Sequence, residues 1–140
     1  MAIPSHINLQ IVSADRLLVS DKVDEVEIPA ADGYLGILPG HTPLLALLQV
    51  GELWYRKGQE KTYLSIAFGF VEVQPDRVTI LAQIAEKADE IDVARAEQAK
   101  KRAEERLSKS AVEMDFERAR IALLKSLIRL QVASRARIRS

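Results

Sequence analysis

The first part of the chain alternates hydrophobic and polar positions with the period of two that β-strands produce. Ile7, Leu9 and Ile11 point one way along such a strand, and their neighbours point the other way. Comparable runs, rich in β-branched or aromatic side chains, follow at residues 23–28, 53–55, 63–66, 70–73 and 78–81. Turn signals separate them, including Asp32-Gly33, Pro39-Gly40, Lys57-Gly58 and Pro75-Asp76. Short strands without intervening helices predict an antiparallel β-sandwich or flattened barrel over residues 5–82.

From Ala88 onward the hydrophobic period changes to about 3.6, which is typical of amphipathic helices. Two helices are predicted, at about 89–108 and 111–138, with the first opening at Asp89 or Glu90. The spacing between Ser110 and Glu113 predicts a capping box at the second helix. The apolar face of the first helix consists of Val93, Ala96, Ala99, Ala103 and Leu107. The apolar face of the second consists of Phe116, Ala119, Leu123, Leu127 and Leu130.

The change of period at residues 86–89 is the only plausible joint between two parts. The pattern therefore predicts an α+β chain, with an N-terminal antiparallel β-sandwich followed by a C-terminal antiparallel two-helix hairpin. We place the two domains at residues 1–86 and 87–140. The alanine-dominated face of the first helix lets a second helix approach closely but buries little apolar area.

Charge divides the chain at the same place. The 140 residues contain 20 basic and 20 acidic side chains, so the formal net charge is zero. Residues 1–84 hold six basic and ten acidic residues, a net charge of −4, and residues 85–140 hold fourteen and ten, a net charge of +4. Residues 118–140 contain seven basic residues and no acidic one. The chain therefore ends in a cationic segment.

Several functional classes are excluded or disfavoured by composition and motifs. The chain has no cysteine and two histidines, which excludes disulfides and thiolate metal sites and disfavours a histidine metal site. No apolar run reaches the roughly 20 residues that span a bilayer. The first residues show no signal or transit pattern, so a cytosolic start is expected. Without a Walker-type loop, a Gly-x-Gly-x-x-Gly or a Gly-x-Ser-x-Gly motif, we expect no independent catalysis.

The segment from Asp32 to Leu44 has the densest local pattern. In a purely structural interpretation its glycines and prolines shape turns, and Leu35, Ile37 and Leu38 join the core. In a functional interpretation Tyr34 and His41 lie on an exposed rim where a rigid loop docks a partner, and Gly36 permits a close backbone approach. The pattern alone favours the structural interpretation.

This segment also carries a family resemblance. Gly33 to Leu44, together with Gly69-Phe70-Val71-Glu72-Val73, Val78-Thr79-Ile80-Leu81-Ala82 and Ile91-Asp92-Val93-Ala94-Arg95-Ala96, resembles the epsilon subunits of rotary F-type ATP synthases, bacterial type. The resemblance covers essentially the whole chain. It implies a ten-stranded β-sandwich that binds the gamma subunit and the c-ring, and a helical hairpin that inhibits ATP hydrolysis. It also implies a non-catalytic central-stalk subunit that couples c-ring rotation to the catalytic head, peripheral on the cytoplasmic face of the bacterial inner membrane.

Ile91-Asp92-x-x-Arg95-Ala96 has two interpretations. Asp92 suits the positive end of a helix dipole, and Arg95 three positions later can pair with it. The resemblance instead implies regulatory ATP binding, as in some bacterial members, with Asp92 accepting from the adenine and cations neutralising phosphates. Lysine at position 125 departs from the arginine of the family pattern and lacks its bidentate fork. The residues implied are Glu86, Ile91, Asp92, Arg95, Ala96, Arg118, Lys125 and Arg129.

The basic C-terminal end also has two interpretations. Arg135, Arg137 and Arg139 follow the point where the apolar pattern fades, as in a solvated, frayed terminus. A nucleic-acid partner fits poorly because no aromatic residue follows Phe116 to stack on a base. The resemblance implies docking onto alpha and beta subunits when the hairpin extends. The remaining alternative for the whole chain is a free-standing ligand-sensing adaptor with an ATP-gated helical arm.

Overall fold

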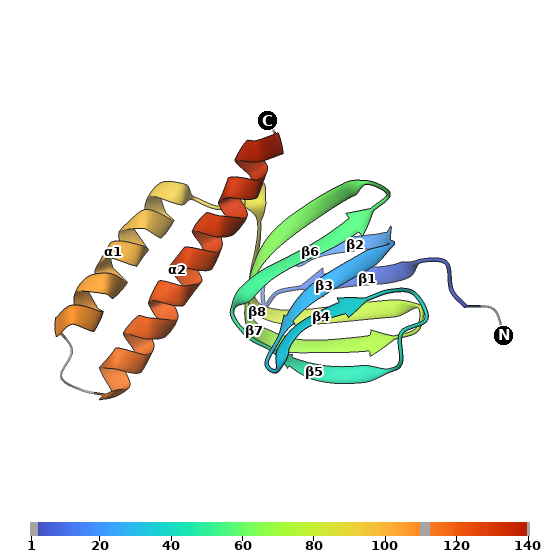
Figure 1. Cartoon of the computed structure of the whole chain (residues 1–140), viewed down its shortest axis with the longest axis horizontal. Helices are drawn as coiled ribbons and strands as arrows, with labels where there is room; N and C mark the ends of the chain where they lie inside the picture. Colours follow the sequence, from blue (N-terminus) through green and yellow to red (C-terminus); the bar gives the residue numbers. More distant parts are fainter. Residues whose placement is uncertain (1–2, 110–112, 140) are drawn as a thin grey trace. The chain divides into compact units, whose positions relative to one another are not determined.

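The computed structural model describes residues 3–109 and 113–139, except for the side chains of residues 114 and 137–139. The chain divides into two compact units, Met1–Glu86 and Lys87–Ser140. The first is a β-sandwich and the second is an antiparallel pair of helices (Figure 1). The predicted α+β class is therefore confirmed. Each unit is described by itself below.

The described part of the sandwich contains eight strands. These are β1 (Ile7–Val12), β2 (Leu17–Val23), β3 (Glu25–Ala30), β4 (Gly33–Ile37), β5 (Leu44–Leu48), β6 (Gly51–Lys57), β7 (Glu60–Gln74) and β8 (Arg77–Lys87). Three of them, β2, β4 and β5, are not among the runs from which strands were predicted. β4 forms a hairpin with β3, and β5 pairs with the second half of β7. The continuous apolar run of β5 lacks the alternation by which strands were recognised.

The long strands β7 and β8 connect the two layers of the sandwich. Residues 60–66 of β7 pair with β6, whereas residues 69–73 pair with β5. β8 lies beside β7, and its first half also pairs with β1. One layer therefore runs β4-β3-β6-β7-β8 and the other β5-β7-β8-β1-β2. Counting each long strand once in each layer gives the ten segments that the resemblance implies, although the described chain has eight continuous strands.

β7 bends between its two halves at Phe68 and Gly69. Both have a positive φ, 62° and 126° respectively, in the left-handed region that side chains rarely adopt. A Cβ atom at Gly69 would overlap the carbonyl oxygen of Leu81 and approach the Cα of Ala82 to 2.9 Å. Glycine is therefore required where the bent strand presses against β8.

One strand pair departs from the predicted antiparallel arrangement. β1 and the first half of β8 are parallel, with Leu9 opposite Val78 and Ile11 opposite Ile80. Most of the sandwich separates these strands in the sequence, which satisfies the need of a parallel pair for a long crossover connection. The pairs β1–β2, β3–β4, β3–β5, β3–β6, β5–β7 and β6–β7 are antiparallel.

Branched aliphatic side chains fill the space between the two layers. Alternate positions of β1, β7 and β8 are fully buried, as the period of two predicts. The largest fully buried side chains are Ile7, Leu9, Ile11, Ile28, Ile37, Leu53, Leu64, Ile66 and Ile80. Ile37 thus joins the core as predicted and Leu35 packs against it, but Leu38 is 55% exposed and its predicted core position was wrong.

The second unit consists of a short 3₁₀ helix, η1 (Ala88–Glu90), and the helices α1 (Val93–Lys109) and α2 (Glu113–Arg139). α1 begins later than predicted because Ile91 and the residue after it interrupt the helix. Asp92 caps α1, since its carboxylate accepts a hydrogen bond from the backbone N–H of Arg95 at 3.1 Å. Ser110, to which a capping box was assigned, lies outside the described residues.

Small side chains form the seam between α1 and α2. Ala96 and Ala103 of α1 are buried at a spacing of seven, and so are Ala119, Ser126 and Ala133 of α2. Ser126 satisfies its hydroxyl by donating to the carbonyl of Ala122. The predicted face of α1 is confirmed. The predicted face of α2 was partly wrong, because Phe116 and Leu127 are 43% and 42% exposed.

Candidate docking and nucleotide sites

The predicted docking residues Tyr34, Gly36 and His41 have different environments. Tyr34 on β4 is half exposed, and its hydroxyl accepts a hydrogen bond from the backbone N–H of Glu52 at 3.2 Å. His41 is partly buried, and its Nδ1 lies 2.7 Å from the carbonyl oxygen of Thr42. His41 is therefore engaged within its own turn, which agrees with the structural interpretation of this segment.

Gly36 corrects an expectation. A Cβ atom there would meet no atom within 4 Å, and its φ lies outside the left-handed region. Gly36 therefore does not serve a close approach within this chain. A close approach beside Tyr34 instead requires glycine at position 51, where a Cβ atom would lie 2.6 Å from Pro29 Cβ and 2.8 Å from the Tyr34 hydroxyl.

A groove of about 400 Å³ lies beside Tyr34, between the end of β3, β4 and β5. Its floor and walls are mostly apolar and include residues 30–35 and 44–47. Leu45 and Leu47 of β5 are 71% and 56% exposed. Sequence reasoning missed this apolar edge, and the run Leu44-Leu45-Ala46-Leu47-Leu48 was the signal that could have identified it.

Part of the predicted nucleotide site lies on the two helices of the hairpin. Because α1 ends at Lys109 and α2 begins at Glu113, positions equidistant from residue 111 lie at about the same height along the antiparallel pair. Asp92 and Arg95 then lie at the height of residues 130 and 127, within about one helical turn of Arg129 and Lys125. Arg118 lies on the same face of α2 as Lys125 but about 10 Å further along the axis, because seven residues rise 1.5 Å each.

The remaining predicted nucleotide contacts divide between buried and exposed positions. Ile91 and Ala96 are buried, so in this conformation they offer a ligand no accessible side-chain surface. Glu86 is partly buried in β8, at the end of the sandwich unit. The cap uses Oδ1 of Asp92, and the carboxylate has a second oxygen. The arrangement supplies one carboxylate and up to three cations along the two facing helices.

The basic C-terminal residues are only partly described. Arg135 lies on α2 and is partly buried. The side chains of Arg137 and Arg139 lie outside the described residues, although the helical backbone continues to Arg139. The structure therefore places these three residues on one helix, and not on an irregular terminus.

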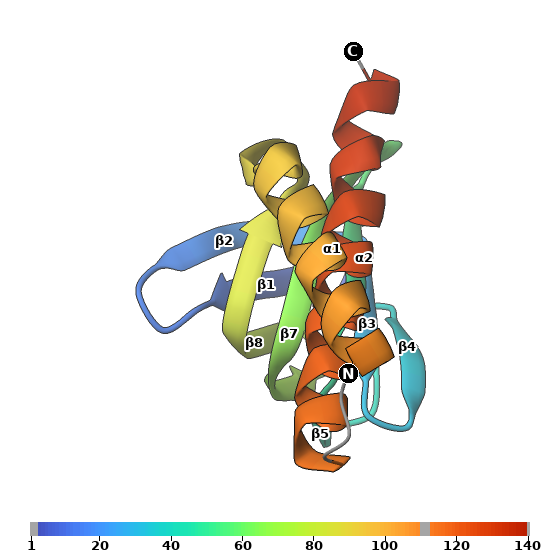
Figure 2. The same cartoon turned by 90° about the vertical axis from the view of Figure 1, so that its left-hand side faces the viewer.

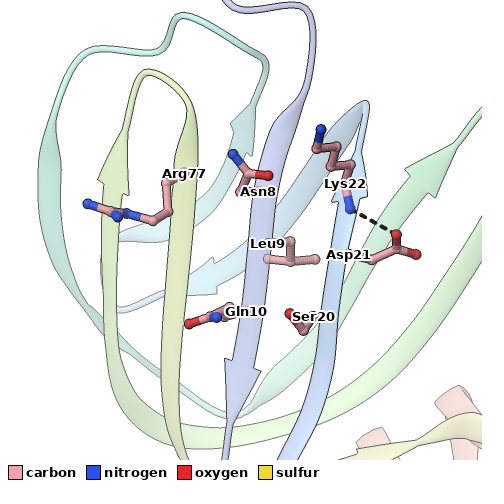
Figure 3. Close-up of a pocket in the computed structure, with 7 residues that line it drawn as sticks. All are labelled: Asn8, Leu9, Gln10, Ser20, Asp21, Lys22 and Arg77. Atoms are coloured by element: carbon pink, nitrogen blue, oxygen red, sulfur yellow. Dashed lines mark hydrogen bonds between the residues drawn. The ribbon is translucent and has the colours of Figure 1, made fainter.

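Part of the outside of the layer formed by β1, β2 and β8 is hydrophilic. A groove of about 470 Å³ there is lined by polar and charged side chains together with Leu9 (Figure 3). Lys22 and Arg77 flank Asn8 in one row, because Asn8 is opposite both of them in the strand registers. Ser20 and Gln10 form the next row. The backbone N–H of Lys22 donates to the carboxylate of Asp21.

An ion network joins the start of β1 to two turns of the sandwich. Asp24 accepts hydrogen bonds from the backbone N–H of Gly58 at 2.7 Å and from His6 Nδ1 at 3.0 Å, and Arg56 lies 3.8 Å away. The hydrogen bond from the Gly58 N–H is the largest cause that lowers the pKa of Asp24. Desolvation opposes it, and the hydrogen bond and charge of His6 and the charge of Arg56 lower the pKa further. The network stabilises the ionised carboxylate.

Neither helix within residues 3–109 and 113–139 has the length and hydropathy that crossing a bilayer requires. The same residues form no cluster of three or more His, Cys, Asp or Glu side chains that could hold a metal ion.

Comparison with known proteins identifies the family. Residues 6–88 match the β-sandwich domain of the ATP synthase delta/epsilon chain, and residues 89–134 match the long α-helix domain of the same chain. The chain is 50% identical to the ATP synthase epsilon chain of Herpetosiphon aurantiacus over 133 residues, which cover 95% of this chain and 98% of the relative. It is 55% identical to that of Koribacter versatilis over 104 residues, or 74% and 73% of the two chains.

A solved structure shows the same fold within an assembly. A chain of the Euglena gracilis mitochondrial ATP synthase, in a complex of OSCP, F1 and c-ring, superposes with a TM-score of 0.81 at 26% identity. The match covers 99% of this chain and 84% of that chain. Together with the two domain matches and the relatives of nearly equal length, it shows that this chain belongs to the epsilon-subunit family of F-type ATP synthases, the non-catalytic subunits of the central stalk.

Proposed function

We propose that the sandwich fastens the gamma subunit to the c-ring, and that the hairpin is a mobile arm that inhibits ATP hydrolysis. The observation that carries this division is the presence of two compact units with different packing. The sandwich has a complete aliphatic core of its own, whereas the buried side chains of α1 and α2, among the described residues, are four alanines, Ser126 and Val132. A thin seam of this kind suits two conformations whose free energies differ by only a few kcal/mol.

Truncation after Glu86 tests this division. The fragment retains every member of the sandwich core, so we expect it to fold and to bind an alpha–beta–gamma complex. Hydrolysis of ATP by the complex should then be faster than with the intact chain. Circular dichroism checks that the fragment folds. Equal inhibition by both forms would show that the hairpin is not the brake, and loss of binding would show that the sandwich alone does not dock.

Charge at the end of α2 provides a milder test. In the extended conformation the basic face would contact the alpha and beta subunits, and Arg135, Arg137 and Arg139 are the residues concerned. Their replacement by Gln should relieve part of the inhibition. Salt should mimic this relief only in part, because it screens exposed charge pairs and spares desolvated ones.

ATP is proposed as a regulatory ligand that holds the hairpin closed. Asp92 and Arg95 lie at about the same height along the hairpin as Lys125 and Arg129, and this arrangement supports the role. ATP should raise the melting temperature of the intact chain, because a ligand that binds only the folded state stabilises it. Asp92→Asn retains an oxygen that can cap α1, whereas Asp92→Ala removes it. Comparison of the two variants therefore separates the effect of losing the helix cap from the effect of losing ATP binding.

Arg95→Ala should abolish the ATP-induced rise in melting temperature, and Lys125→Arg should increase it if residue 125 contacts a phosphate. If calorimetry detects no binding at millimolar ATP, ATP is not a ligand of this chain, and the proposed docking function is unaffected. The proposed location is peripheral, on the cytoplasmic face of a bacterial inner membrane, through the complex alone. A free monomer without affinity for any ATPase subunit would favour the ligand-sensing adaptor instead.

A further inference from the structure

The segment at the start of the second unit carries one buried side chain between exposed ones. Ile91 is 8% exposed, whereas its neighbours Glu90 and Asp92 are exposed. The backbone of Ile91 is extended, with φ −75° and ψ 126°, between the end of η1 and the start of α1. We call residues 87–91 the strap, and Ile91 is its buried member.

Hydrogen bonds on both sides fix the position of Ile91. Before it, the backbone N–H of Lys87 donates to the carboxylate of Glu90 at 3.1 Å, which closes η1. After it, the carbonyl oxygen of Asp92 accepts from the backbone N–H of Ala96 at 3.0 Å, in addition to the carboxylate cap of α1. Because both flanks are already ordered, burial of the Ile91 side chain costs little further backbone entropy.

On α2, Val132 is buried away from the alanine seam. It is 0% exposed and is the one branched side chain among the buried residues of α1 and α2 that the structure describes. Consecutive residues of a helix are rotated by about 100°, so Val132 does not face the same way as Ala133 of the seam. Ile128, one turn earlier on the face of Val132, is only partly buried, so the full burial is local.

The height of Val132 along the hairpin identifies its neighbour within the second unit. Residue 132 lies at about the height of residue 90, and α1 begins only at Val93. Figure 2 shows α2 continuing past the start of α1. η1, which ends at Glu90, packs against α2. This arrangement places the strap, and not α1, beside Val132.

We propose that the strap is a conformational lock of the hairpin, in which Ile91 packs with Val132 and keeps α2 closed against α1. The inference rests on the proposed function of the hairpin as a mobile arm and names the contact that regulates its opening. An alanine of the seam removes one methyl group from water, whereas Ile91 and Val132 bury branched side chains and therefore contribute more per residue. The strength of this contact sets how often the arm is free to extend.

A thiol in the seam reports the opening of the hairpin. The chain has no cysteine, and Ser126 is 2% exposed in the seam. Ser126→Cys changes one atom and introduces a thiol that a soluble reagent reaches only when the hairpin opens. Its reaction rate in the full-length chain, without nucleotide, therefore measures the open fraction even where that fraction is small. The variants in this background are Val132→Ala, Ile91→Ala and their combination, with Gln131→Ala at an exposed position as the matched control.

We expect Val132→Ala to raise the reaction rate at least about fivefold and Ile91→Ala at least about tenfold, since truncating a buried aliphatic side chain leaves a cavity. Alanine has a higher helix propensity than valine, so the increase for Val132→Ala cannot come from a weaker helix. Gln131→Ala should leave the rate within about twofold. In the combined variant the increase should be smaller than the product of the two single increases, because the two side chains share one contact.

Unchanged rates in the two single variants, or a combined increase equal to their product, would overturn the lock and leave the mobile arm standing. A thiol that reacts as fast in the otherwise unchanged chain as in urea would show that the hairpin does not close, and would overturn the arm itself. If circular dichroism shows that Val132→Ala lowers helicity at 222 nm, Ile91→Val is measured in its place. Its expected increase is at least about twofold, and an unchanged rate would again overturn the lock.

Discussion

The sandwich and the hairpin are closed by opposite kinds of side chain. All the largest fully buried side chains belong to strands, and they are Ile, Leu and Val residues that each gain about 1.5–3 kcal/mol by burial. The seam between α1 and α2 is made of Ala96, Ala103, Ala119, Ser126 and Ala133. Alanine has a single methyl group to remove from water, so this seam stabilises the closed hairpin far less per residue.

The comparison shows how one small chain can combine a tightly packed unit with a unit that small side chains close. Interdigitated branched side chains fix one arrangement, because any displacement opens cavities. A smooth alanine seam can separate with little loss. The following changes break or sharpen this contrast, from the largest expected effect to the smallest.

The largest effect is expected at the bend of β7. Gly69→Ala adds a Cβ atom that overlaps the Leu81 carbonyl oxygen, at a φ of 126°. The sandwich should lose at least about 3 kcal/mol of unfolding free energy, measured by urea denaturation. Gly36→Ala is the matched control, since its Cβ meets no atom within 4 Å, and it should change stability by less than about 0.5 kcal/mol. Equal effects of the two substitutions would refute the role assigned to the bend.

An intermediate effect is expected at the helical seam. Ala103 is 2% exposed, and Ala103→Leu adds three carbon atoms at this buried position. The substitution should lower the unfolding free energy of the hairpin by about 1–3 kcal/mol. The loss should appear as reduced helicity at 222 nm, while the near-ultraviolet signal of Trp54 in the sandwich persists. Ala94→Leu, at an exposed position of the same helix, should leave helicity unchanged. A single joint transition of both units would contradict their independence.

The smallest effect is expected in acid. The pKa of Asp24 lies below its ordinary value of 3.8 in the folded chain. The carboxylate therefore contributes stability above pH 3.8, and this contribution disappears as the pH falls through the lowered value. Asp24→Asn should reduce stability at pH 7 and weaken its decline below about pH 4. Thermal denaturation between pH 2 and 7 measures both, and identical pH profiles of the two chains would exclude this role of the Gly58 and His6 contacts.

The sequence predicted what depends on local periodicity. The period of two located the strands with alternating burial, and the period of 3.6 located both helices. The period of two missed β2 and β4, and it missed β5 because five consecutive apolar residues have no alternation. The core position predicted for Leu38 was wrong because position relative to a turn does not determine burial. Phe116 and Leu127 were misplaced since α2 is apolar on more than one face, and only packing against α1 selects the face that is buried.

The candidate sites were predicted to a smaller extent. The helix-start role of Asp92 follows from residue type, although it is the backbone N–H of Arg95 that meets the carboxylate, and not the guanidinium that the pattern suggested. The exposed leucines Leu17 and Leu81 share no signature along the chain. Only the strand registers place both of them opposite Val12.

The continuity of β7 and β8 through both layers has a mechanical consequence. In a sandwich of separate sheets, a shearing force on one sheet reaches the other only through side-chain packing, which can slide. Here two polypeptide strands pass from layer to layer, and at Gly69 one is wedged against the backbone of the other. Force applied to one layer is therefore carried to the other along covalent bonds. We therefore expect the sandwich to resist shear between its layers, which is the property that the proposed fastening to a rotating stalk requires.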